Sequence, residues 1–376
     1  MQTPDPNPTK VNGMYTRYFG DASQPPVILI HDSFGDASVK NSDTPNGGPS
    51  LNALYFEFGV DAHSVPLMVA QQLATAGTTG GFFVIVYDLR GQGRSDDVAS
   101  PSEYNYKQYS DDLNAIIKFY NIQDAQHSRN LTIIGHSHGG IVALKFDEMN
   151  PGVAKKIILL DTPLDVAQTM STIATQCQDR YTKSGETSKV EVMKTSLASL
   201  NAETTSKRDR ATIAKQLFSS AATCGGNTGL YTASSPELPV DPNLDVRDPA
   251  EIAYASKLSA YNAHQNALKT YEMISWLHLN ISEKNQTLPL VSFEENEDFL
   301  HVNEHAYVKA NNNHIFGLYG TLDGLFDQAA LAQIKTSLGA DVDAGAGHMV
   351  MIDGASHNVF IDRTTMASLI FIATNL

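Results

Sequence analysis

The feature that most constrains the fold is a regular alternation of short apolar runs and helix-like segments. Six runs are predicted to be buried strands: Val27–Ile30, Phe82–Tyr87, Leu131–Ile134, Lys156–Leu160, Ile315–Tyr319 and Met349–Ile352. The predicted helices of this alternation are Val65–Ala76, Tyr106–Tyr120, Gly139–Met149, Asp327–Leu338 and Arg363–Ala373. Strands that are apolar throughout suit a parallel sheet covered on both faces. We therefore predict a doubly wound α/β sheet.

The alternation is interrupted between the fourth and fifth of these runs. Over about 163–309 the sequence shows no comparable strand, and its helical patterns are Pro163–Ala174, Val190–Leu200, Arg208–Ala221 and Pro249–Leu279. The simplest interpretation is a core domain of residues 1–162 and 310–376 with a helical cap domain, residues 163–309, inserted into it. A shorter insertion from Asp36 to about Ser64 is rich in Gly, Asn, Ser and Pro, and is predicted to be a loop near the site.

Composition limits the partners that the chain can have. Its 376 residues, of which 42% are hydrophobic, suffice for one large core with a cap. A net charge of −15 repels phosphate backbones and anionic lipids, so no nucleic-acid partner is expected. No apolar run approaches the roughly 20 residues that span a bilayer, so no membrane insertion is predicted. No metal-ligand spacing stands out and no cofactor is expected, while the oligomeric state stays open.

Three features bear on the location of the protein. The first residues are polar and proline-rich, which is typical of a flexible mature terminus. N-x-S/T sequons occur at Asn130, Asn280 and Asn285. Cys177 and Cys224 either remain thiols or form a disulfide, which would stabilise the fold by about 3–4 kcal/mol. Together these features favour a secreted protein, with a cytoplasmic one as the alternative.

The pentapeptide Gly135–Gly139 reads Gly-His-Ser-His-Gly and lies between a predicted strand and a predicted helix. In this G-x-S-x-G context a sharp turn holds the serine in a strained conformation, with its hydroxyl clear of the sheet. The two glycines leave room for the neighbouring chain. The N-terminus of the following helix favours negative charge beside the serine. Ser137 is therefore the predicted nucleophile.

A serine becomes a good nucleophile only when a base takes its proton. Among the twelve histidines, His357 follows the last predicted strand directly, at the edge where α/β sheets place their chemistry. His348 precedes the same strand and is a poorer candidate. His136 and His138 flank the serine and are expected to pack around it or to line the pocket. The predicted base is His357.

A carboxylate should orient the base and stabilise its cation. The expected chain order is serine, acid, histidine. Asp323 follows the strand that ends at Tyr319 and lies between the other two residues in sequence, so it is the predicted acid. The alternatives are Asp161, at the end of the strand that follows the Gly135–Gly139 turn (the elbow), and Asp327, which is expected to start a helix.

An oxyanion that develops during acyl transfer needs two backbone N–H donors. The first should come from His138, directly after the nucleophile. The second should come from the loop after the first predicted strand, where Ser33 is the preferred donor and Phe34 the next choice. His31 is expected to hold that loop in place.

Together these segments resemble the α/β-hydrolase fold superfamily. His31-Asp-Ser-Phe-Gly35 resembles its H-G-x-x-G loop, and the nine residues from Tyr87 to Ser95, Tyr-Asp-Leu-Arg-Gly-Gln-Gly-Arg-Ser, resemble its Y-D-x-R-G-x-G-x-S turn. The resemblance covers about residue 12 to the end, outside the insertions. It implies a mostly parallel sheet, a cap inserted after the sixth strand, and a serine rather than an aspartate nucleophile. Asp32 departs from the pattern, because the family usually has glycine there.

The elbow resembles those of esterases and lactonases, so a carboxylic ester or lactone hydrolase is the leading hypothesis. The cap would then supply an apolar pocket, for which the aromatic candidates are Trp276, Phe293, Phe299 and Tyr307. The same residues could equally well serve only to pack the cap.

The large helical insertion resembles the caps of proline iminopeptidases, although their H-G-G-P-G and G-x-S-W-G motifs are absent. An aminopeptidase of that kind is the alternative. Its substrate amine would need carboxylates, and an acidic run offers them at Glu294, Glu295, Glu297 and Asp298, unless this run is only a solvated face. A third hypothesis is a relative without enzymatic activity or one that transfers acyl groups. The expected substrate is thus a small ester, a lactone or a short peptide.

Overall fold

A computed structural model describes residues 9–31, 73–74, 81–91, 95–96, 98–122, 130–217, 287–321, 323–339, 348–352, 357 and 372–373. Within them the chain forms one eight-stranded sheet in the order β1-β2-β4-β3-β5-β6-β7-β8. The strands are β1 Thr9–Val11, β2 Met14–Phe19, β3 Pro26–Ile30, β4 Phe83–Tyr87, β5 Thr132–His136, β6 Lys156–Leu160, β7 Ile315–Gly320 and β8 Met349–Ile352. Strands β3 to β8 pair in parallel, whereas β1 and β2 form an antiparallel edge next to β4.

The two faces of the sheet carry separate apolar layers, because successive side chains of a strand point to opposite sides. Ile28 and Ile30 of β3 join a layer that includes α3 (Tyr106–Phe119), α4 (His138–Met149) and α11 (Gln328–Ser337). Val27 and Leu29 join the opposite layer, together with the helical residues 73–74 and 372–373. Burial on both faces explains why the parallel strands are apolar at nearly every position.

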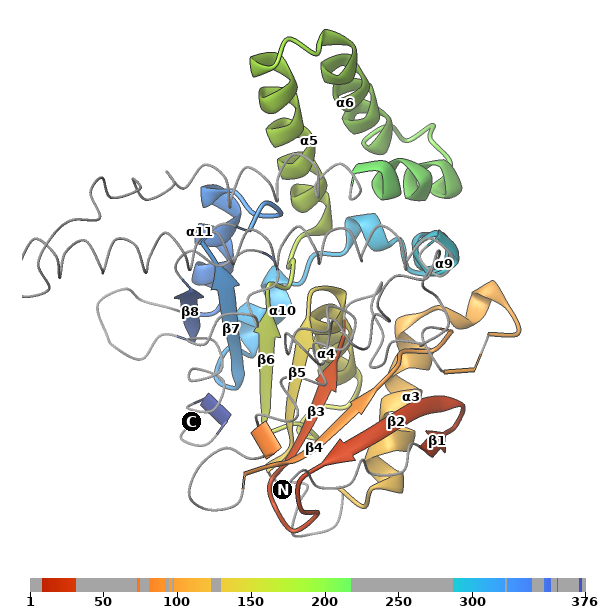
Figure 1. Ribbon diagram of the computed structural model, residues 1–376, viewed down its shortest axis with the longest axis vertical. Coiled ribbons are helices and arrows are strands. Elements are labelled where there is room, and N and C mark those ends of the chain that lie inside the picture. The colour runs from red at the N-terminus through yellow and green to blue at the C-terminus, as the bar shows by residue number, and fades with distance from the viewer. Residues whose placement is uncertain are drawn as a thin grey trace, which may run out of the picture.

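The described part of the insertion consists of helices that begin after β6 and end before β7. They are α5 Val166–Lys183, α6 Thr187–Leu200, a helix over 207–217, α9 Thr287–Glu297, the 3-10 helix η4 Phe299–His301 and α10 His305–Ala310. Figure 1 shows α5, α6 and α9 beyond the carboxyl ends of the parallel strands. The insertion therefore lies at the edge of the sheet where the elbow is located.

The two ends of the insertion are bonded to each other. Asp165 and Asn303 form an isolated antiparallel bridge, and the side-chain amide of Asn303 donates to the Asp165 carboxylate at 2.7 Å. On either side, the Val166 N–H donates to the Val302 oxygen at 3.1 Å, and the Glu304 N–H donates to the Leu164 oxygen at 2.6 Å. The chain thus leaves and rejoins the core at one point.

The predicted fold class is confirmed, and all six predicted strands are present with ends that shift by at most two residues. The antiparallel pair β1–β2 and the helices α9 and α10 were not predicted. Predictions for the loop over 36–64, the helix Pro249–Leu279, and most of the helices Val65–Ala76 and Arg363–Ala373 lie outside the described residues.

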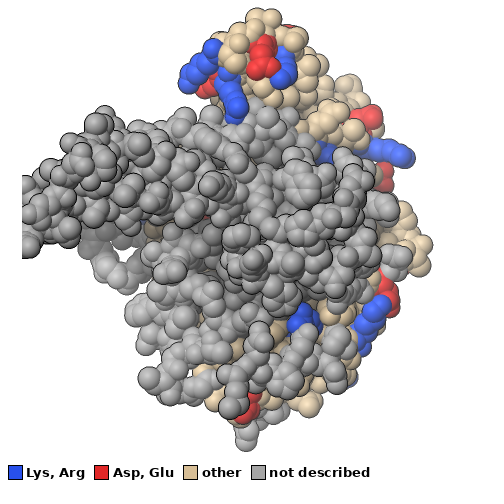
Figure 2. All heavy atoms as spheres, viewed as in Figure 1, with Lys and Arg blue, Asp and Glu red and all other residues tan. Residues whose placement is uncertain are grey.

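Charged side chains of both signs lie together at the end of the α5–α6 hairpin. Figure 2 shows Lys and Arg side chains beside Asp and Glu side chains at the end of the α5–α6 hairpin, where Lys189 pairs with Glu186.

Within the ranges that the structure describes, no helix is long and apolar enough to cross a membrane.

The tight turn after β4 is fixed by a buried ion pair. Arg90 donates through Nε to Asp112 of α3 at 2.8 Å, and its Nη1 contacts Glu103 at 2.9 Å. The Asp112 side chain is only 2% exposed, and burial raises the pKa of its carboxyl while Arg90 opposes that rise. The guanidinium thus keeps a charged carboxylate stable inside the core.

We expect Arg90→Met to lower the free energy of unfolding by about 3 kcal/mol at neutral pH, because it leaves the buried Asp112 without its cation. Urea denaturation measures the effect. The matched control is Lys107→Met in α3, the helix of Asp112. Lys107 pairs with Asp111, both side chains are exposed, and the expected loss is about 0.3–0.5 kcal/mol. Equal losses in the two variants would contradict the stabilising role of Arg90.

Candidate active site

The elbow at Ser137 has the strained geometry that its sequence predicts. Ser137 lies between β5 and α4 with φ 51° and ψ −122°, a region that side-chain-bearing residues rarely adopt. A Cβ on Gly135 would lie 2.4 Å from the Gly139 oxygen, and one on Gly139 would lie 2.3 Å from the His31 oxygen. Both glycines are therefore required by the close approach of neighbouring backbone.

Three side chains from three strand ends meet at this elbow. His357 Nε2 lies 3.1 Å from Ser137 Oγ, and His357 Nδ1 lies 2.8 Å from Asp323 Oδ2. The Asp323 side chain is fully buried, and its Oδ1 accepts the Leu325 N–H at 2.8 Å. A carboxylate at Nδ1 leaves Nε2 as the proton acceptor that faces the serine. This geometry can deprotonate an alcohol oxygen.

Of the two alternative acids, Asp327 caps a helix, whereas Asp161 lies near the His357 ring without being its hydrogen-bonded carboxylate. Asp327 caps the N-terminus of α11, where its Oδ1 accepts the Ala330 N–H at 2.7 Å. Asp161 is completely buried after β6, with a left-handed backbone (φ 45°), and its Oδ1 accepts the Gly320 N–H at 2.9 Å. Burial, together with the carboxylates of Asp161 and Asp323, raises the pKa of Tyr319 well above its ordinary value. The site thus contains two buried carboxylates.

Three other histidines that the sequence brought into consideration have packing or bridging contacts. His31 accepts the Leu89 N–H at 2.9 Å through Nε2, which is the structural role expected for it. His348 lies before β8, and its Nδ1 is 3.1 Å from the main-chain oxygen of Ile315. His136 Nε2 lies 2.9 Å from the main-chain oxygen of His357, a contact that sequence reasoning missed because it joins residues 221 positions apart.

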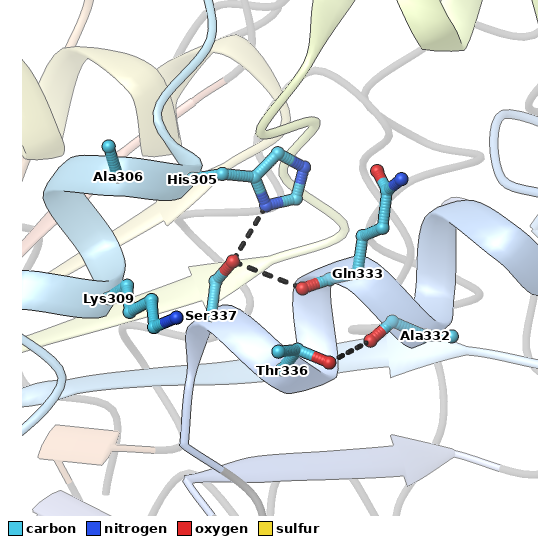
Figure 3. A pocket seen from close by; sticks show the side chains of 7 residues that line it. All are labelled: His305, Ala306, Lys309, Ala332, Gln333, Thr336 and Ser337. Atoms are coloured by element: carbon cyan, nitrogen blue, oxygen red, sulfur yellow. Dashed lines mark hydrogen bonds between the residues drawn. The ribbon is translucent and has the colours of Figure 1, made fainter.

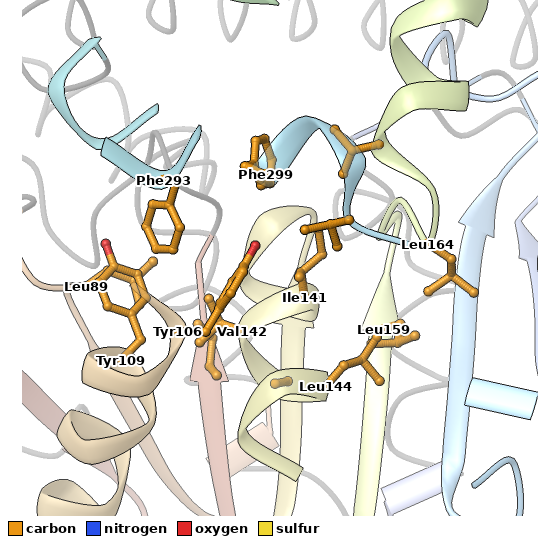
Figure 4. Packing of buried hydrophobic residues seen from close by; sticks show 14 of the residues in the cluster. Leu89, Tyr106, Tyr109, Ile141, Val142, Leu144, Leu159, Leu164, Phe293 and Phe299 are labelled. Carbon is orange, nitrogen blue, oxygen red and sulfur yellow. The ribbon is translucent and has the colours of Figure 1, made fainter. Parts of the chain in front are cut away.

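Residue His138 connects the elbow with the cap. It is the first residue of α4, so its N–H belongs to the helix-end amides that lack an intrahelical acceptor. Its ring lies 4.9 Å from Phe293 and 5.3 Å from Phe299, centroid to centroid, and 5.8 Å from Tyr106. Figure 4 shows Phe293 and Phe299 above Tyr106 and the α4 side chains.

The aromatic pocket candidates of the cap are mostly buried in packing. Phe293 is 2% exposed and Phe299 5% exposed, and both belong to the main apolar layer. Tyr307 donates its hydroxyl to Asp147 of α4 at 2.8 Å. Trp276 lies outside the described residues, as do the predicted oxyanion donor Ser33, its alternative Phe34, Asp32 and Cys224. Cys177 is buried in α5.

The acidic run of α9 is engaged in structural contacts. Glu294 is completely buried, accepts from Arg210 Nε at 2.8 Å and accepts the Leu300 N–H at 2.9 Å. Glu297 accepts the Tyr106 N–H at 3.0 Å. Asp298 accepts from Arg210 Nη2 at 2.9 Å. Most of these carboxylates thus hold the cap together and join it to α3.

Among the residues that the structure describes, two groups of side chains have donor atoms within 4.8 Å of one another, a spacing that a metal ion could use: His136, Asp161 and His357, and Glu294, Asp298 and His301. The second group contacts the Arg210 guanidinium, whose charge disfavours a bound cation. The first group shares His357 with Ser137 and Asp323, and a metal there would compete with their hydrogen bonds. Neither environment therefore favours a metal ion.

An open groove of about 510 Å³ lies between α10 and α11. Figure 3 shows His305 directed toward Ser337, with 2.8 Å between Nδ1 and Oγ. Burial lowers the pKa of His305. The Ser337 hydroxyl donates to the Gln333 oxygen at 3.0 Å, which commits its proton to the helix. This second His–Ser pair is a helix contact, and none of Ser137, His357 and Asp323 lines the groove.

Solved structures are similar to this chain at low sequence identity. A proline iminopeptidase-related protein from Thermus thermophilus is 15% identical with a TM-score of 0.53, over 98% of this chain and 96% of that one. An esterase from a Rhodococcus species is 14% identical over 100% of both chains, with a TM-score of 0.48. A proline iminopeptidase from Mycobacterium smegmatis is 13% identical, with coverages of 98% and 97% and a TM-score of 0.48.

The family of this chain is identified from its sequence. No curated protein matches the chain significantly. The family described as alpha/beta hydrolase fold matches residues 46–363, which is most of the chain. Its span includes Ser137, Asp323 and His357 together with the helical insertion. The chain therefore belongs to the alpha/beta hydrolase fold family.

Proposed function

We propose that this protein is a serine hydrolase that cleaves a carboxylic ester or lactone through an acyl-enzyme on Ser137. The observation that carries the proposal is the His357 ring, which lies within hydrogen-bond distance of Ser137 Oγ on one side and of Asp323 on the other. Side chains from three distant parts of the chain converge there, and this arrangement is the one that nucleophilic catalysis by serine requires.

In the first half of the reaction, Ser137 Oγ attacks the substrate carbonyl carbon while His357 Nε2 accepts the hydroxyl proton. The tetrahedral intermediate then collapses, the bond to the alkoxide breaks, and His357 returns the proton to the leaving oxygen. In the second half, His357 takes a proton from water, the hydroxide attacks the acyl carbon, and Ser137 leaves with that proton. Asp323 stabilises the imidazolium in both halves.

The oxyanion of each tetrahedral intermediate needs N–H donors close to Ser137. The His138 N–H at the start of α4 is our proposed first donor, and the positive end of that helix adds to its effect. The Ser33 N–H is the proposed second donor. One observation supports this choice. The main-chain oxygen of His31, two residues earlier, lies so close to Gly139 of the elbow that a Cβ on Gly139 would be 2.3 Å from it.

An ester substrate fits the cap better than a peptide with a free amine. An aminopeptidase must pair the substrate ammonium with carboxylates that are not already neutralised. In the acidic run, Arg210 neutralises Glu294 and Asp298, Glu297 is engaged by a backbone N–H, and Glu295 is exposed on the surface. We also infer that residues 163–309 act as one cap domain that bounds the acyl site. A separate inference, which the N-x-S/T sequons support, is that the protein is secreted.

Hydrolysis of p-nitrophenyl esters of increasing acyl length, compared with aminoacyl-naphthylamides, tests this proposal. We expect ester turnover to exceed amide turnover by at least about 10²-fold at saturating substrate. An alkyl fluorophosphonate should label the protein once, and peptide mapping should place the label on Ser137. Rapid amide cleavage without ester turnover would favour the aminopeptidase alternative and overturn the ester assignment.

A further inference from the structure

His136 links the backbone of the nucleophile to the backbone of the base. It is the last residue of β5, directly before Ser137, and it is 5% exposed. Its Nε2 lies 2.9 Å from the main-chain oxygen of His357. Because a carbonyl oxygen only accepts hydrogen bonds, Nε2 must carry the proton. The contact is therefore a donated hydrogen bond whose direction is fixed.

The donor end of this link is held rigidly. His136 pairs with Leu160 in the parallel ladder between β5 and β6, and the Ser137 N–H donates to the Leu160 oxygen at 2.8 Å. The rings of His136 and His357 lie 5.0 Å apart, centroid to centroid, and are tilted by 44°. A central strand thus supports the His136 backbone, and the His136 ring lies next to both the main-chain oxygen and the ring of His357.

The acceptor end has less support from the sheet. His357 lies five residues beyond the end of β8, so regular strand pairing does not fix its backbone. Its ring bonds to Ser137 and Asp323 constrain the side chain. The bond from His136 constrains the main chain of the same residue. Ring and backbone together define where Nε2 lies relative to Ser137 Oγ.

The second buried carboxylate lies beside this link. A carboxylate oxygen of Asp161 lies within 4.8 Å of ring nitrogens of both His136 and His357. The strained backbone of Asp161 and the N–H donated by Gly320 hold that carboxylate in place. Strain of this kind is characteristic of functional sites, where the surrounding structure maintains it.

On these contacts we infer that His136 is a positioning residue for the catalytic base, which it holds at the correct distance from Ser137 through the main-chain oxygen of His357. The inference rests on the proposed serine mechanism. A positioning residue acts on the chemical step rather than on substrate binding, and a displacement of about 1 Å at a reacting group can lower a rate about 10²-fold.

The experiment compares His136→Phe with His136→Gln and measures kcat and KM on the best p-nitrophenyl ester. Phenylalanine keeps a planar ring but has no donor, so kcat should fall about 30- to 100-fold while KM stays within about twofold. Glutamine can place an amide N–H near the position of Nε2 and should recover most of that loss. The control His305→Phe removes a histidine bond to Ser337 in α10–α11 and should leave both constants unchanged.

Each outcome decides the inference. An unchanged kcat in His136→Phe, or a His136→Gln variant no more active than it, overturns the positioning role. Should the phenylalanine variant fail to fold, His136→Asn replaces it, because the shorter asparagine amide cannot reach the His357 oxygen. The asparagine variant should then be less active than the glutamine variant. Equal activities of the two variants overturn the positioning role. A wild-type protein without ester turnover or fluorophosphonate labelling would overturn the proposed function itself, a result distinct from an active wild type with insensitive variants.

Discussion

Ser137→Ala is expected to reduce ester turnover by about 10⁵- to 10⁶-fold, because the variant retains the binding site but has no atom to form the acyl-enzyme. The fold should be intact, since the glycines on either side and the ladder between β5 and β6 maintain the elbow. Initial rates with a p-nitrophenyl ester measure the loss, and thermal unfolding checks the structure. Labelling by a fluorophosphonate should disappear as well.

Ser196→Ala is the matched control for this variant. Ser196 is a buried serine in α6 of the insertion and is no part of the contacts around His357. Its replacement should leave turnover within about twofold of wild type, as is typical of substitutions away from a functional site. If Ser137→Ala kept more than about 1% of the wild-type rate, the covalent mechanism would be wrong.

Asp323→Asn is expected to lower kcat by about 10⁴-fold, the second largest effect. Oδ1 of Asp323 accepts the Leu325 N–H, so an asparagine here keeps its carbonyl oxygen on that side and turns its NH₂ group toward His357 Nδ1. A donor at Nδ1 selects the imidazole tautomer whose proton is on Nε2. That tautomer cannot accept the Ser137 proton.

Asp327→Asn provides the comparison for this substitution. Asp327 was an alternative acid in the sequence and lies four residues from Asp323, but it caps α11 through the Ala330 N–H. Asparagine caps helices about as well as aspartate, so activity and stability should stay close to wild type. Rates at neutral pH for both variants decide the matter: a larger loss in Asp327→Asn than in Asp323→Asn would reassign the acid.

The parallel strands were predictable from the sequence, because burial on both faces leaves a continuous apolar run such as that from Ile157 to Leu160. The edge pair was not, because β1 is three residues long and β2 has an intermediate or exposed second half. Helix α9 was missed for another reason. Its hydrophobic residues show almost no helical periodicity, and Pro289 is in its first turn.

The candidate site likewise has residues that the sequence predicted and contacts that it did not predict. Ser137, Asp323 and His357 could be selected because each follows a predicted strand, and parallel strands bring their carboxyl ends to one edge. Contacts between distant residues left no such signal. Arg210 precedes its partner Glu294 by 84 residues, so the acidic run was open to interpretation as a solvated face or an amine site. The bond from His136 to His357 likewise depends on where a loop returns.

The bridge between Asp165 and Asn303 has a consequence for how such a protein can diversify. Because the two ends of the insertion are bonded to each other, the chain between them forms a loop whose ends are already held together. Lengthening a closed loop costs little, about 0.6 kcal/mol for each doubling. Sequence changes and length changes within the insertion should therefore be tolerated while the strands that lead to Ser137, Asp323 and His357 stay unaltered.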